Sequence, residues 1–220
     1  MYQQLKEVSL YYEKNGQGTP ILLLHGNGET HDIYDKLIPK LSKDYTVYAI
    51  DSRGHGRSSK VQTLDYGQMA EDIVQFISLQ NIDNPILYGF SDGGILGLMI
   101  AIRYPKLLSK LIISGANTKP KGIKPKYLWL IRLFYTFTRD SKYHLMLTQP
   151  NIEEAELKLI KTYTVILAGS KDVVVEKHTK YIADCIPGST LQIIEGETHD
   201  SYVVHSEQLY DVILPYLKND

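Results

Sequence analysis

Short runs of consecutive apolar residues recur along the chain, and longer stretches with helical periodicity separate them. Unbroken apolar runs are typical of strands buried on both faces of a parallel sheet. The pattern predicts strands at residues 8–12, 21–24, 45–50, 86–88, 111–113, 165–168 and 191–194. Apolar positions three or four residues apart predict helices near 69–77, 95–104, 181–185 and 209–217. The alternation predicts a single α/β domain over residues 1–220, with a mainly parallel central sheet flanked by helices.

Residues 118–162 interrupt this alternation, and we predict that they form an inserted, largely helical lid. Residues 119–142 contain seven Lys or Arg and one acidic residue, a net charge of +6, and the rest of the chain therefore carries −7. The apolar run at 127–137 suggests a pocket lining, with Trp129 in contact with substrate. The basic excess fits an anionic substrate or an anionic membrane surface. A helix that simply packs its aromatics on the core and exposes its lysines explains the same pattern.

Composition narrows the class of protein. Hydrophobic residues make up 43% and charged residues 22%, which is ordinary for a globular chain. A net charge of −1 argues against a nucleic-acid-binding protein. The single cysteine, Cys185, cannot form an internal disulfide and is too little for a structural zinc site. A single cysteine is typical of a reducing, intracellular setting, so we expect a cytoplasmic protein. The polar N-terminus predicts no signal peptide, and the lack of an apolar run near ~18 residues predicts no membrane span.

The segment 89–93 fits the pattern Gly-x-Ser-x-Gly, between a predicted strand and a predicted helix. This is the context of a nucleophile elbow, a sharp turn that lifts a serine hydroxyl above the sheet edge. Side chains two residues on either side would collide, which explains Gly89 and Gly93. Ser91 is therefore the candidate nucleophile, although a glycine-rich turn with a capping serine has the same sequence.

A serine hydroxyl needs a base, and the base needs an orienting carboxylate. His199 follows the last predicted strand, whereas the other histidines lie in predicted helices, in the lid, in glycine-rich turns or, for His31, after the first loop. Asp172 follows the strand at 165–168 and is the candidate carboxylate. Asp200 is adjacent to His199 and poorly placed to reach its ring, and Asn117, after the preceding strand, is uncharged. The order Ser91, Asp172, His199 is that of the α/β-hydrolases.

A tetrahedral intermediate needs hydrogen-bond donors for its oxyanion. The backbone N–H of Asp92, directly after the nucleophile, is one candidate. The second is the backbone N–H of Asn27, in the loop after the strand at 21–24, where an ordinary glycine-rich turn is the alternative. Phe90, next to the serine, is a candidate substrate contact.

The chain resembles the α/β-hydrolase superfamily of serine hydrolases over essentially its whole length. Five motifs stand in the order of that family, at residues 25–28, 51–58, 89–94, 169–172 and 196–199. The resemblance implies that Asp51 and His55, in the Asp-x-Arg-Gly-x-Gly loop, are architectural. Its Ser-Asp-Gly-Gly form hints at small-ester hydrolases such as the valacyclovirase-like enzymes. A serine at position 91 argues against the members that cleave epoxides or carbon–halogen bonds, because those use aspartate as the nucleophile.

These observations predict a serine hydrolase that cleaves a small ester through an acyl-enzyme. We expect a small-molecule substrate, no cofactor, no metal, no nucleic-acid partner, no stable membrane insertion, and a monomer or homodimer. The same triad also serves amide or carbon–carbon bond hydrolysis and acyl transfer. A binding protein of hydrolase shape that retains the triad is the alternative outside the enzymes.

Overall fold

The computed structural model describes residues 1–218, in which eight strands form one sheet in the order β1-β2-β4-β3-β5-β6-β7-β8. The strands are β1 Tyr2–Gln4, β2 Ser9–Asn15, β3 Thr19–Leu24, β4 Tyr45–Ile50, β5 Ile86–Phe90, β6 Lys110–Ser114, β7 Tyr163–Gly169 and β8 Thr190–Ile194. All neighbouring pairs from β4 across to β8 are parallel, and β1 and β2 add antiparallel at one edge. The predicted α/β fold with a mainly parallel sheet is confirmed.

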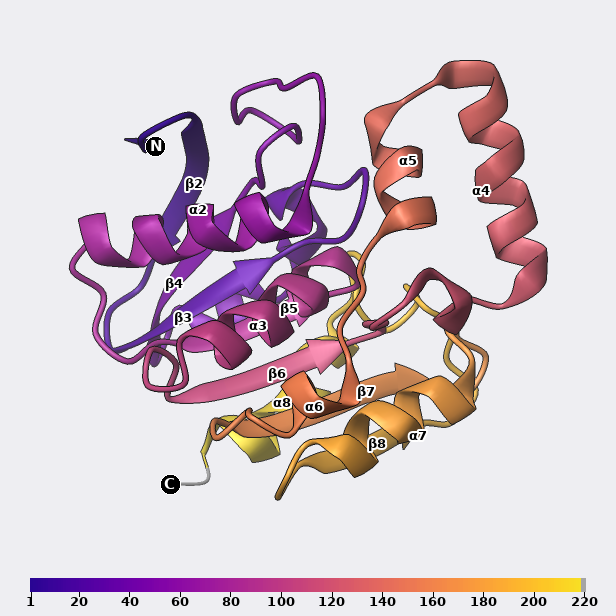
Figure 1. The fold of residues 1–220 in the computed structure, drawn as a ribbon. Helices are drawn as coiled ribbons and strands as arrows, with labels where there is room; N and C mark the ends of the chain where they lie inside the picture. The colour runs from indigo at the N-terminus through magenta and orange to yellow at the C-terminus, as the bar shows by residue number, and fades with distance from the viewer. Residues whose placement is uncertain (219–220) are drawn as a thin grey trace.

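Helices cover both faces of this sheet (Figure 1). They are η1 His31–Tyr34, α1 Ile38–Leu41, α2 Tyr66–Leu79, α3 Asp92–Arg103, η2 Pro120–Gly122, α4 Pro125–Thr138, α5 Ser141–Thr148, α6 Glu154–Leu157, α7 Glu176–Cys185 and α8 Gln208–Leu217. Successive strand residues point to opposite faces, so Leu22 and Leu24 join the core under α2 and α3, while Ile21 and Leu23 join that under η1, α1 and α8. Burial on both faces explains why these strands are unbroken apolar runs.

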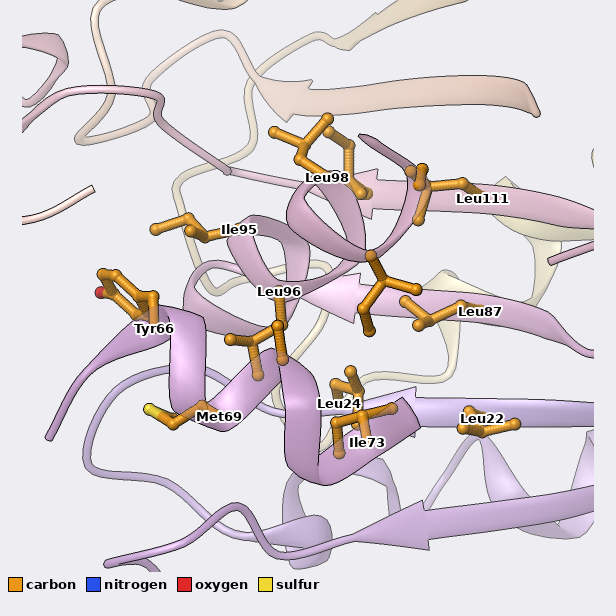
Figure 2. Close-up of a cluster of buried hydrophobic side chains, with 14 of the residues drawn as sticks. Leu22, Leu24, Tyr66, Met69, Ile73, Leu87, Ile95, Leu96, Leu98 and Leu111 are labelled. Carbon is orange, nitrogen blue, oxygen red and sulfur yellow. The ribbon is translucent and has the colours of Figure 1, made fainter. Parts of the chain in front are cut away.

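Helices α2 and α3 form the larger of the two cores with the central strands (Figure 2). Figure 2 shows Ile73 of α2 beside Leu24 of β3, and Leu96 of α3 in the same cluster with Leu22 and Met69. These side chains are at most 2% exposed. The packing fixes the N-terminus of α3, and with it the residue that precedes this helix.

Several short elements were not predicted. Strand β1 carries the polar sequence Tyr-Gln-Gln and is held by pairing with β2 rather than by burial, so it leaves no apolar run. Strand β2 extends beyond the predicted 8–12 to Asn15, because its polar end pairs with β4. Helices η1 and α1 have four residues each, too few to produce a helical period.

Between β6 and β7 the chain leaves the sheet and forms η2, α4, α5 and α6. Helix α4 packs mainly on α5 and η2, and Figure 1 shows it standing at the outer edge of the molecule. Helix α5 is anchored by Leu145, which is fully buried in the larger core. Among the described residues no helix is long and apolar enough to cross a membrane.

Candidate active site

The residues singled out from the sequence follow different parallel strands. Asn27 follows β3, Ser91 follows β5, Asp172 follows β7 and His199 follows β8. The carboxyl ends of parallel strands meet at one edge of the sheet, where open α/β sheets bind their ligands. The topology therefore brings together four side chains that are as many as 172 residues apart in the chain.

Ser91 sits in a strained turn between β5 and α3. Its backbone has φ 52°, a left-handed conformation that is rare for residues other than glycine. A Cβ on Gly89 would lie 2.2 Å from the carbonyl oxygen of Gly93, and a Cβ on Gly93 would lie 2.1 Å from that of Leu24. Only glycine fits at either position, as the predicted elbow requires. The N-terminus of α3 starts directly after Ser91, where its dipole favours negative charge.

Ser91, His199 and Asp172 form a continuous hydrogen-bonded chain. His199 Nε2 lies 3.1 Å from Ser91 Oγ, and His199 Nδ1 lies 2.7 Å from Asp172 Oδ1. The same carboxylate oxygen accepts a hydrogen bond of 2.8 Å from the backbone N–H of Val174. Asp172 is 3% exposed. With Nδ1–H directed at this buried carboxylate, Nε2 carries the lone pair that can accept the Ser91 proton.

The imidazole of His199 is held from two further sides. The ring of Phe90 lies 4.9 Å from it, centroid to centroid. Gly115, directly after β6, has φ 64°, and a Cβ there would come within 2.6 Å of His199 Cε1. A side chain at position 115 would therefore displace the ring from Ser91.

The backbone N–H groups of Asn27 and Asp92 donate no hydrogen bond to any group in residues 1–218. Both residues line the cavity above Ser91. The loop that carries Asn27 is tied to α3, because Gly93 N–H donates to the carbonyl of His25 at 3.1 Å. This arrangement fits the predicted pair of oxyanion donors, whose role stays a prediction.

The cavity above Ser91 has a volume of about 680 Å³, within the range of small-molecule sites. Phe90, Ser91 and His199 lie in its floor, and α4 contributes Tyr127, Leu130, Ile131 and Phe134 to its wall. The wall is largely apolar, with a few polar groups near the serine. The arrangement suits a ligand with an apolar body and one reactive polar group.

Comparisons with known proteins agree with this architecture. A sequence model of the alpha/beta hydrolase fold family matches residues 19–164. The chain belongs to the α/β-hydrolase fold family. The predicted resemblance is confirmed, and with it the assignment to the hydrolases.

Several named proteins are similar to this α/β hydrolase in sequence or in structure. The chain is 25% identical to the serine hydrolase BPHL of Mus musculus, over 96% of this chain and 84% of that protein. It is 23% identical to the pimeloyl-[acyl-carrier protein] methyl ester esterase of Aliivibrio fischeri, over 95% and 97% of the two chains. Among solved structures, the esterase EaEST from Exiguobacterium antarcticum superposes with a TM-score of 0.86 at 22% identity, covering 99% of each chain. That last likeness reflects the fold.

One predicted contact of this α/β hydrolase is wrong. Trp129 is not among the residues that line the cavity, and its side chain is 62% exposed. The cavity face of α4 is set by Tyr127, Leu130 and Phe134, which recur every three or four residues, and Trp129 falls outside that stripe. Phe90, in contrast, lies in the cavity floor as expected, and its contact with substrate stays a prediction.

A polar network beside the nucleophile was not predicted. Asp92 is 4% exposed; its Oδ1 accepts a 2.6 Å hydrogen bond from the hydroxyl of Tyr66, and its Oδ2 accepts a 2.9 Å bond from Asn27 Nδ2. Burial raises the pKa of Asp92 to about 6, although both hydrogen bonds act in the opposite direction. The network ties the loop after β3 to the N-termini of α2 and α3. No sequence pattern pointed to Tyr66, because it is the first residue of α2 and lies far along the chain from the Gly-x-Ser-x-Gly motif.

Glu29 is a second group of the site that the sequence did not indicate. It lines the cavity, and its Oε2 accepts a 2.9 Å hydrogen bond from the N–H of Gly26. Burial raises the pKa of Glu29 to about 7, although that hydrogen bond and the nearby His199 lower it. A carboxyl of this kind changes charge near neutral pH within reach of the triad.

The loop after β4 is structural in this α/β hydrolase, as the resemblance implied. Asp51 accepts hydrogen bonds from the N–H and Nδ1 of His31, at 2.8 and 2.7 Å, and from the N–H of Arg57 at 2.8 Å. Burial opposes ionisation, but these bonds outweigh it and lower the pKa of Asp51 to about 2. His55 bonds the carbonyl of Arg53 at 3.0 Å. Residues 1–218 contain no group of three or more His, Cys, Asp or Glu side chains able to hold a metal ion.

Proposed function

We propose that this α/β hydrolase is a serine esterase that cleaves a small carboxylic ester through an acyl-enzyme on Ser91. The observation that carries the proposal is the hydrogen-bonded chain from Ser91 Oγ through His199 to the buried carboxylate of Asp172. The names of several relatives, which include a methyl ester esterase, support an ester as the substrate. The apolar cavity supports a substrate with an apolar acyl or alcohol part.

The reaction begins when His199 Nε2 takes the hydroxyl proton of Ser91 and Oγ attacks the ester carbonyl carbon. The carbonyl oxygen becomes an oxyanion, which the backbone N–H groups of Asn27 and Asp92 stabilise. The Asp172 carboxylate stabilises the imidazolium that forms and keeps its ring in place.

The intermediate collapses when the bond to the leaving oxygen breaks and His199 Nε2–H protonates that oxygen. An alcohol departs and the acyl group stays on Ser91. Water then attacks the acyl carbon while Nε2 takes one of its protons. Nε2 returns this proton to Ser91 Oγ as the acyl bond breaks, and a carboxylic acid leaves.

Replacement of Ser91 tests the proposal. We expect Ser91→Ala to lower kcat for p-nitrophenyl butyrate by at least ~10⁴-fold with an unchanged melting temperature, because only the nucleophile is removed. Ser78→Ala, on the exposed face of α2, is the matched control and should keep full activity. Turnover by Ser91→Ala at the rate of the native protein would overturn the proposal.

A panel of leaving groups separates esters from the other bonds that this triad can cleave. Esters, amides and β-diketones of one acyl group are compared by kcat/KM, and esters should lead. Labelling of native protein, but not of Ser91→Ala, by a fluorophosphonate would distinguish an activated serine from a hydrolase-shaped binding protein.

A further inference from the structure

Helix α4 exposes a group of large apolar side chains to solvent. None of its 14 residues is buried. Five large apolar side chains of this one helix are exposed: Trp129, Leu130, Leu133, Phe134 and Phe137. Phe137 reaches 79% and Trp129 62%. Single exposed apolar residues are common on proteins, but a contiguous group marks a contact surface.

Three of these side chains, including the two most exposed, share one face of the helix. Trp129, Leu133 and Phe137 are spaced four residues apart and so lie along one stripe. The helix packs on α5 through a different face, where Tyr135 meets His144 at 5.4 Å between ring centroids. Figure 1 shows α5 on the inner side of α4 and nothing on its outer side. The stripe is therefore unpartnered in the described residues.

The same helix is basic. It contains Lys126 and Arg132 and no acidic residue, and Lys121 and Arg139 flank it. None of these four groups forms an ion pair within residues 1–218. Among the other basic residues nearby, Lys119 is paired with Glu153 at 2.7 Å. Positive charge that no carboxylate neutralises, beside exposed aromatic side chains, complements an anionic, partly apolar surface.

We propose that α4 docks on the surface of an anionic lipid bilayer. An amphipathic helix with Lys and Arg beside Trp, Phe and Leu lies in the plane of the interface and buries its apolar side chains among the lipids. Tryptophan favours the same depth. At 14 residues α4 is shorter than the ~20 that a spanning helix needs, so the contact is peripheral.

The shape of the surface favours lipid over protein. A protruding helix presents a convex ridge, which a folded partner could cover only with a matching groove, whereas a deformable bilayer receives it directly. Leu130 and Phe134 are exposed and also line the cavity, so the stripe runs up to the cavity opening. Docking through α4 would turn that opening toward the bilayer.

The chain carries its own reporter for this contact. Trp129 is its single tryptophan and lies on the proposed surface. Full-length protein is titrated with vesicles of phosphatidylcholine alone and of phosphatidylcholine with phosphatidylglycerol. With anionic vesicles, we expect a blue shift of the emission, quenching by doxyl-labelled lipid and co-sedimentation. With neutral vesicles, binding should be at least ten times weaker, because the charge contribution is lost.

Two double variants separate the charge from the apolar stripe, with unchanged melting temperature as the test of folding. Lys126→Gln with Arg132→Gln should weaken binding to anionic vesicles roughly thirty-fold. Leu133→Ser with Phe137→Ser should abolish the blue shift. The matched control is Leu79→Ser with Leu159→Ser, two leucines exposed elsewhere on the surface, which should bind like the native protein.

Several outcomes would overturn the proposal. One is an unchanged emission and no sedimentation with anionic vesicles, and another is equal binding to neutral vesicles. A blue shift that grows with protein concentration in the absence of lipid, with a dimer in analytical ultracentrifugation, would assign the stripe to a second copy of the chain. Binding to poly-glutamate without binding to vesicles would assign it to an acidic protein.

Discussion

The loops at the carboxyl ends of the strands and the helix α4 lie on opposite sides of one cavity, and they are held in place in different ways. The loops are fixed by buried hydrogen bonds, as between Asp172 and His199, and by close backbone packing at Gly89 and Gly93. Helix α4 has no buried residue and little contact beyond α5 and η2. The residues of the hydrogen-bonded chain are thus anchored to the sheet, whereas the cavity wall formed by α4 is held by few contacts.

The largest expected effect tests the loops that are fixed to the sheet. Asp172→Asn should lower kcat for an activated ester by about 10⁴-fold, because an amide can stabilise the wrong tautomer of His199 and cannot balance the imidazolium charge. Kinetics with p-nitrophenyl butyrate measure the loss. Asp200→Asn is the control, since Asp200 is exposed and bonded to Thr198. A loss in the control as large as that in Asp172→Asn would contradict the assignment.

The second prediction compares two residues of the inserted segment. Leu145 of α5 is fully buried, whereas Phe137 of α4 is 79% exposed. Leu145→Ala should lower the free energy of unfolding by about 2–5 kcal/mol through the cavity it leaves. Phe137→Ala should change it by less than about 0.5 kcal/mol. Urea denaturation measures both, and equal losses would show that α4 is held more tightly than its exposure indicates.

The smallest expected effect concerns Glu29, a carboxyl in the loop after β3 whose burial lowers the stability of the folded protein. The pKa of Glu29 rises from an ordinary 4.5 to about 7 on folding. Between these pH values the native protein holds a proton that the unfolded chain has released, so the contribution of Glu29 to stability falls as pH rises through the window. Glutamine does not titrate and keeps an oxygen that can accept the hydrogen bond from Gly26.

Glu29→Gln should therefore gain stability relative to the native protein by about 1–2 kcal/mol between pH 5 and pH 8, allowing for partial solvent screening. Urea denaturation of both proteins at the two pH values provides the difference. The difference cancels the other titrating groups, which both proteins share. Stability differences that are equal at pH 5 and pH 8 would contradict the raised pKa.

The loops that are fixed to the sheet could be predicted from the sequence, whereas the surroundings of the site could not. Buried strands leave apolar runs, and a strand-to-helix turn leaves glycines at fixed spacing, so the sheet and the position of Ser91 were accessible. The loops of Asp172 and His199 follow such runs, and the topology then brings them to one edge. Strand β1 was missed because pairing alone stabilises it.

The surroundings of the site were less accessible, because they depend on side chains from different elements meeting in space. Tyr66 reaches Asp92 from the N-terminus of α2, and Glu29 folds back on Gly26. No local pattern encodes either contact. Trp129 was misplaced because an apolar run on an exposed helix gives no indication of which face turns inward.

The positive φ of Ser91 also limits which other residues this turn could accept as a nucleophile. Branching at Cβ is strongly disfavoured in the left-handed region, so threonine would strain the backbone even though it offers the same hydroxyl. Cysteine and aspartate, which are unbranched at Cβ, meet no such barrier. The turn can therefore accept the thiol of cysteine or the carboxylate of aspartate in place of the serine hydroxyl, but not the secondary alcohol of threonine.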